Sequence, residues 1–143
     1  MFMNAREFVA VIKHHAVDGA ANNIIRELSA PLSEPAVPGT GESEIGRSIS
    51  AFVYRGKLEK YRRARWFQAL IAEDQAEVIS LLRDCANATA SHFFAVLDGV
   101  GGDTPGVFEV VEVDGHIRHT LNPENSDMLH DVFSEICETE ISS

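Results

Sequence analysis

The longest helical pattern in the sequence covers residues 73–98, and its length limits the possible dimensions of the fold. The face expected to point inward steps by three or four positions, through Val78, Leu82, Cys85, Thr89, Phe93 and Val96. Acidic residues occupy the first turn, where negative charge favours the start of a helix. A helix of this length spans about 39 Å. We therefore expect a long central helix on which the other elements pack.

Shorter helical patterns lie on both sides of this segment. Helical spacing of apolar residues predicts further helices over residues 4–16, 19–29, 58–71 and 126–137. Asp18-Gly19 is expected to separate the first two, because aspartate is a good helix cap. Residues 47–57 fit either a helix or a strand, and Gly56 is expected to end either one. Their helical surroundings favour a helix there.

The apolar period changes from helical to alternating near the C-terminal end, where residues 107–121 predict a β-hairpin. Asp114-Gly115 lies between two strand-like runs, which is a strong hairpin signal. A turn at this dipeptide would pair Glu112 with Ile117 and Val110 with His119. The face expected to point inward carries Phe108, Val110, Ile117, His119 and Leu121.

These elements predict an α+β fold, mainly helical, as a single domain over residues 1–143. The length suits one ordinary domain. Residues 30–46 hold three of the five prolines and three of the ten glycines. This composition predicts a mobile Pro/Gly-rich loop.

The net charge of −10 is concentrated at one end of the chain. Residues 1–97 carry 11 basic and 11 acidic residues, whereas residues 98–143 carry 11 acidic residues and one basic residue, Arg118. A concentration of one sign of charge speeds encounter with a partner of the opposite sign. The carboxylates expected to form an acidic partner-binding surface are Glu109, Glu112, Asp114, Asp127, Asp131 and Glu135.

Six of the 12 basic residues lie between Arg55 and Arg65, with aromatic residues among them. This pattern also occurs in RNA contacts, but the net negative charge opposes nucleic acid, and no nucleic-acid partner is expected. The remaining interpretations are pairing with the acidic end, in the same chain or a second copy, and a protein contact. The secondary basic patch consists of Arg55, Lys57, Arg62 and Arg65.

Catalytic and metal-binding patterns are missing from the sequence. His116 and His119 are three apart on a strand and point to opposite faces, so they cannot chelate together. Cys85 and Cys137 are expected to be reduced thiols on apolar helix faces. Neither a metal nor a cofactor is expected. The polar side chains expected to line a pocket, if one lies between the long helix and the hairpin, are Tyr61, His92 and His119.

These patterns favour a binding protein over an enzyme. The leading hypothesis is a non-catalytic inhibitor, immunity-type or regulatory module whose acidic C-terminal surface binds a basic protein. Small acidic bacterial immunity proteins share this size and composition, without a shared residue motif. The alternatives are a small-molecule-binding protein or enzyme with the pocket just described, and a homo-oligomer joined by basic-to-acidic contacts.

The sequence also favours a cytoplasmic location without membrane contact. Arg6, Glu7 and Lys13 interrupt any apolar run near the start, so no secretory leader is expected. A membrane span needs about 18 consecutive apolar residues, and the sequence offers no such run.

Overall fold

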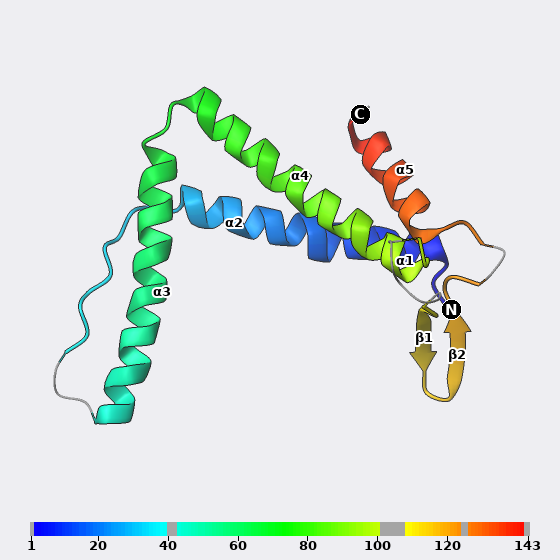
Figure 1. Cartoon of the computed structure of the whole chain (residues 1–143), viewed down its shortest axis with the longest axis horizontal. Coiled ribbons are helices and arrows are strands. Elements are labelled where there is room, and N and C mark those ends of the chain that lie inside the picture. The colour runs from blue at the N-terminus through cyan, green and yellow to red at the C-terminus, as the bar shows by residue number, and fades with distance from the viewer. Residues whose placement is uncertain (1, 40–42, 101–107, 124–125, 142–143) are drawn as a thin grey trace. The chain divides into compact units, whose positions relative to one another are not determined.

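A computed structural model describes residues 2–39, 43–100, 108–123 and 126–141. It is mainly helical, with the long helix predicted near the middle of the chain, a two-stranded antiparallel hairpin and a C-terminal helix (Figure 1), which confirms the predicted fold class. In chain order the elements are α1 (Ala5–Ile12), η1 (Lys13–Asp18), α2 (Gly19–Ser29), α3 (Glu44–Gln68), α4 (Ala72–Leu97), β1 (Val111–Asp114), β2 (Ile117–Thr120) and α5 (Leu129–Ile141).

The chain forms two compact units, which are described separately below. Unit 1 comprises Met1–Ala21 and Leu81–Ser143, and unit 2 comprises Asn22–Ser80. Helices α2 and α4 contribute residues to both units. A single domain over residues 1–143 stays a prediction.

The N-terminal helical segment is continuous from Ala5 to Ser29. The predicted break at Asp18-Gly19 is therefore wrong. The segment η1 is π-helical and continues α1 without a break. Val9, Lys13 and Val17 are all buried. Asp18 does not cap a new helix, because its carboxylate accepts a hydrogen bond from Lys13 within η1.

The core of unit 1 lies among α1, η1, the C-terminal part of α4 and α5. Phe94 and Leu129 are fully buried, and the Phe94 ring lies against Phe133 with centroids 5.4 Å apart. Val9 is also fully buried, and α1 packs against α5. This interlocking of residues far apart in the sequence gives unit 1 a filled interior.

Helix α4 matches the predicted 73–98 closely, but a different face points inward. Ala90 and Phe94 are buried, whereas Phe93 is 54% exposed. Cys85 is exposed and Cys137 is half-buried, and both are free thiols. The expectation of a core thiol is therefore wrong for Cys85. The closing helix α5 begins three residues later than predicted and extends to Ile141.

The hairpin forms within the predicted range, but its register differs from the prediction. Glu112 pairs with His119 and Asp114 pairs with Ile117, so the turn residues are Gly115 and His116. Gly115 has a φ of +57°, and no other described residue of the hairpin has positive φ. A type II′ turn needs glycine at its first central position, which explains why the turn lies one residue later than predicted.

In the hairpin, residues near the base are more buried than residues near the turn, whichever face they lie on. Leu121 is buried and Val110 and His119 are half-buried, whereas Ile117 is 60% exposed and Phe108 is 48% exposed. The expected inward face is therefore only half correct. Asn122 extends the ladder at the base, because it accepts from the Val110 amide and donates to the Phe108 carbonyl.

Unit 2 is built around α3, a single helix from Glu44 to Gln68 that covers the predicted 47–57 and the predicted 58–71 up to residue 68. The helix passes through Gly56, so the prediction that Gly56 ends it is wrong. The Gln68 side chain donates to the carbonyls of Leu28 and Ala30, which fastens the end of α2 to the end of α3. The described part of the predicted 30–46 loop contains no helix or strand before Glu44. Residues 40–42 lie outside the described residues.

Candidate protein-binding surfaces

The division into units separates the charges of the chain. Unit 1 contains 14 acidic and four basic residues, and unit 2 contains eight of each. The whole net charge of −10 therefore belongs to unit 1. All six carboxylates predicted for the partner-binding surface lie in this unit. We refer to Glu109, Glu112, Asp114, Asp127, Asp131 and Glu135 as the acidic surface.

Two members of the acidic surface lie on the outer side of α5. Asp131 and Glu135 are four residues apart, which places them on one helix face, and both are exposed. Arg6 Nη1 lies 2.9 Å from Glu135 Oε2, and His130 Nε2 lies 3.4 Å from Asp131 Oδ1. Both carboxylates remain more than 60% exposed, so water and an incoming cation can reach them.

The other members lie on or near the hairpin and before α5. Glu109 accepts a hydrogen bond from the Thr120 hydroxyl, and Glu112 accepts one from the Met3 amide. Asp114 is exposed beside the turn, and Asp127 is exposed where it lines a groove. Glu112 is therefore used in holding the N-terminal segment, whereas Asp114 presents its charge to solvent.

A buried lysine joins two parts of unit 1, and the sequence patterns did not single it out. Lys13 Nζ lies 2.9 Å from Glu140 Oε2 and also donates to Asp18. Burial lowers the pKa of Lys13, but the two carboxylates together outweigh it, so its pKa lies above the ordinary value. Val9 and Val17 lie four residues away on either side, and this spacing was the available signal for burial.

The same lysine influences Cys137. Burial raises the pKa of the Cys137 thiol, and the nearby Lys13 charge offsets only part of this effect. A thiol with a raised pKa is a poor nucleophile at neutral pH. The Lys13 cluster is therefore a structural tie between η1 and α5.

A second missed contact fixes the start of α5. Asp98 Oδ2 accepts hydrogen bonds from the His130 amide at 2.9 Å and from His130 Nδ1 at 2.8 Å. The Asp98 side chain is only 4% exposed. A carboxylate at a helix N-terminus satisfies free amides and interacts favourably with the helix dipole. Asp98 thus connects the end of α4 to the start of α5 across 32 residues of sequence.

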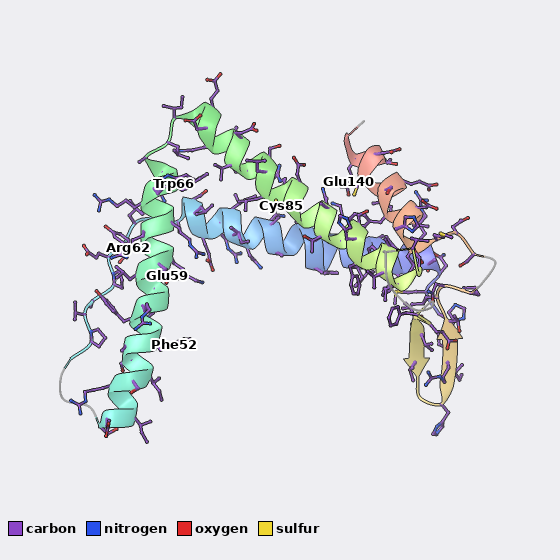
Figure 2. All side chains as sticks on the ribbon, in the orientation of Figure 1. Phe52, Glu59, Arg62, Trp66, Cys85 and Glu140 are labelled. Atoms are coloured by element: carbon purple, nitrogen blue, oxygen red, sulfur yellow. The ribbon has the colours of Figure 1, made fainter. Side chains whose placement is uncertain are left out.

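The secondary basic patch lies on α3 in unit 2, where Figure 2 labels Arg62. Arg55, Lys57, Arg62 and Arg65 are all exposed. Helix α3 contains seven basic and two acidic residues. In the described part of unit 2, Lys60 forms the one ion pair of an α3 cation, with Glu27. Most of the positive charge of α3 is therefore directed to solvent.

The three residues proposed for a pocket lie in separate surroundings. Tyr61 lines a groove of unit 2 together with Lys57 and Lys60. His92 is exposed on α4 and contacts the Ala88 carbonyl of its own helix. His119 stacks on Phe2, with ring centroids 5.3 Å apart, and borders a groove of unit 1.

Over the part of the chain that the structure describes, no three His, Cys, Asp or Glu side chains are grouped as a metal site. In the same residues, no helix combines the length and apolar character needed to cross a membrane. No protein-family model, curated protein or solved structure matches this chain.

Proposed function

We propose that this protein is a non-catalytic protein-binding module whose acidic surface binds a basic protein partner. An inhibitor, immunity-type or regulatory role fits such a module. The observation that carries the proposal is the confinement of the whole net charge of −10 to unit 1. Exposed carboxylates on one compact unit attract and orient a basic partner at long range.

The geometry of the acidic surface supports a role in recognition. Asp131 and Glu135 lie on α5, whose inner residues Leu129 and Phe133 are buried. The carboxylates are thus mounted on a helix held by the core, and side chains on rigid elements lose less freedom when a partner binds. A cytoplasmic location is part of the proposal, and the two free thiols are typical of a reducing compartment.

The test compares two variants with the same change in total charge. One neutralises Glu109, Asp114, Asp131 and Glu135 as Gln or Asn. Its matched control neutralises Glu34, Glu44, Glu73 and Asp74 of unit 2. Tagged wild-type protein is used to capture a basic protein from its own host, and the affinity for the purified partner is then measured at about 0.1 M and 0.5 M salt.

We expect the first variant and the higher salt to weaken binding at least about tenfold, with the control close to wild type. Equal affinities for the two variants would contradict the proposal. Failure to retain any basic protein at low salt would contradict it as well.

A second candidate function is the binding of a small molecule in the groove beside His119. This groove has a volume of about 500 Å³ and brings His119, Arg6 and Asp127 together. Ligand sites combine such a concavity with a few polar groups. Screening small anions and zwitterions by thermal shift tests this function, with a response that His119→Ala abolishes as the supporting result.

A further inference from the structure

The segment η1 is a π-helical turn between the α-helices α1 and α2. A π turn closes hydrogen bonds between residues five apart, and such turns are rare and often lie at functional sites. Lys13 and Asp18 are the first and last residues of η1, and the Lys13 ammonium donates to the Asp18 carboxylate. Residues five apart diverge by about 140° in an α-helix. The ion pair of Lys13 with Asp18 therefore favours the π-helical register.

Lys13 has a second carboxylate that does not depend on this register. Its Nζ lies 2.9 Å from Oε2 of Glu140, which Figure 2 labels near the end of α5. Lys13 is the first residue of the turn, so its direction relative to α1 and α5 is set before the turn begins. An α-helical register would thus cost Lys13 its contact with Asp18 and leave its contact with Glu140. A buried cation that keeps one carboxylate is far less costly than one that keeps none.

The sequence from residue 16 onward suits two registers. Three pairs of adjacent apolar residues follow one another at spacings of four, which are Ala16-Val17, Ala20-Ala21 and Ile24-Ile25. The second residue of each pair is buried or half-buried, and the first is exposed. Ile24, for example, is 46% exposed. A shift of the helix by one residue would therefore exchange each covered apolar side chain for another apolar one.

Conversion of η1 to an α-helix produces this one-residue shift. A π turn holds one more residue than an α turn, so in the α-helical register each later residue takes the direction now held by the residue after it. The exposed member of each apolar pair would then take the covered position of its neighbour. The end of α2 favours the present register, because Leu28 is buried and the exposed Glu27 would take its place.

We infer that η1 is a register switch, in which the Lys13–Asp18 ion pair holds the π-helical state and loss of that pair lets the turn become α-helical. The helix after Asp18 then rotates by about 100° about its axis. The Asp18 side chain is 36% exposed, so a cation from outside can compete with Lys13 for it. Loss of Glu140 has the opposite effect, since Asp18 is then the sole carboxylate on Lys13 and the π-helical state is locked.

This switch and the proposed function can fail separately, because Lys13, Asp18 and Glu140 do not belong to the acidic surface. The experiment measures which side of α2 is exposed. Ala20→Cys and Ala21→Cys are made separately, each with Cys85→Ser to remove the exposed native thiol. The alkylation rate of each introduced thiol is located by peptide mass mapping.

The ratio of the two alkylation rates reports the register. With a minor state populated at 10% or less, the thiol at position 20 should react at least about tenfold faster than the thiol at position 21. Lys13→Met and Asp18→Ala should each lower this ratio below about threefold, because the ion pair that holds the turn is gone. Glu140→Gln should leave the ratio unchanged or raise it.

Arg6→Met is the matched control for the loss of an ion pair. Arg6 lies on α1 and pairs with Glu135 of α5, so the control removes a contact between the same helical segment and α5 but outside η1. It should keep the wild-type ratio. A folded Lys13→Met variant with the wild-type ratio would overturn the inference, as would a Glu140→Gln variant whose ratio falls as far as that of Asp18→Ala. Circular dichroism verifies folding.

Deletion of His15 decides the matter even if Lys13→Met fails to fold. His15 is exposed, and its removal takes out the extra residue of the π turn, so an α-helical segment then keeps the present covered side of α2. Lys13 and Asp18 become four residues apart, a spacing at which side chains meet in an α-helix. We expect a folded variant with the wild-type ratio. An unfolded deletion variant or a reversed ratio would overturn the inference.

Discussion

The two units bury very different amounts of apolar surface. Among the described residues, unit 1 contains nine buried hydrophobic residues and unit 2 contains three, which are Leu28, Ala64 and Phe67. Unit 2 also holds nine of the 17 exposed large hydrophobic residues. Burial of apolar surface is the main favourable term in folding. The comparison teaches that unit 1 has a core of its own, whereas unit 2 leaves nine large apolar side chains exposed.

The largest expected effect comes from the centre of the unit 1 core. Phe94 is fully buried against Phe133, and Phe94→Ala should destabilise the protein by about 4 kcal/mol through lost burial and the cavity left behind. Phe67→Ala in unit 2 is the matched substitution, and we expect it to cost about 3 kcal/mol because a thinly packed site collapses more easily. Urea unfolding measures both free energies.

Amide hydrogen exchange locates the two effects. Amides of α5 should lose protection in the Phe94→Ala variant, and amides of α3 in the Phe67→Ala variant. Equal free-energy costs of the two substitutions would contradict the conclusion that unit 1 is more densely packed than unit 2.

The next effect concerns the buried cation of unit 1. Lys13→Ala should cost about 3 kcal/mol, since it removes both the ion pairs and the packed aliphatic stem. Lys13→Met keeps the stem, and Asp18 and Glu140 are exposed enough to be hydrated, so its cost should be about 1 kcal/mol. Thermal unfolding at neutral pH compares the two. Equal costs would show that charge, and not packing, dominates this site.

The pKa of Lys13 also predicts a pH dependence. Its pKa in the folded protein is raised above the ordinary value of 10.5. The stabilisation by the Lys13 charge is therefore fully present below pH 10.5 and is lost as the pH rises through the folded-state pKa. The stability difference between wild type and Lys13→Met should shrink between about pH 9 and pH 12. A difference that stays constant over this range would contradict the ion-pair interpretation.

A smaller effect is expected where α4 connects to α5. Asp98→Ala removes the carboxylate that accepts from the His130 amide and ring, and it should cost about 2 kcal/mol. Asp98→Asn retains an acceptor for the amide and should cost about half as much. Urea unfolding measures both. If Asp98→Asn proved as costly as Asp98→Ala, the charge of Asp98 would be the main contribution, and the capping hydrogen bond a minor one.

Element types were predictable from the sequence because the apolar spacing of most segments is unambiguous. The long helix α4 was predicted over 73–98 and extends over Ala72–Leu97. Its inward face was not predictable, since Phe93 and Phe94 are adjacent and either can point to the core. The hairpin turn was displaced because Gly115 suits both the second position of a type I′ turn and the first position of a type II′ turn.

The structural ties of unit 1 depend on contacts that no local pattern contains. A lysine is ordinarily expected at the surface. The burial of Lys13 depends on its ion pair with Glu140, which is 127 residues away in the sequence. Asp98 was interpreted as part of a helix stop, because His130 is distant in the sequence. The residues of the acidic surface were predictable from the sequence, since all six carboxylates lie in a segment with a single basic residue, Arg118. The structure adds that the acidic surface and the basic α3 belong to two different compact units.

The smallest expected effect concerns the stability of α3, which contains a glycine in its interior. Gly56 lies in the middle of this helix, and a Cβ atom placed there would meet no atom within 4 Å. Glycine costs a helix interior about 0.5–1 kcal/mol relative to alanine, because it loses more backbone freedom on folding. Gly56→Ala should therefore stabilise unit 2 by about that amount, measured by thermal unfolding. Destabilisation would contradict the expectation that backbone freedom at Gly56 limits the stability of α3.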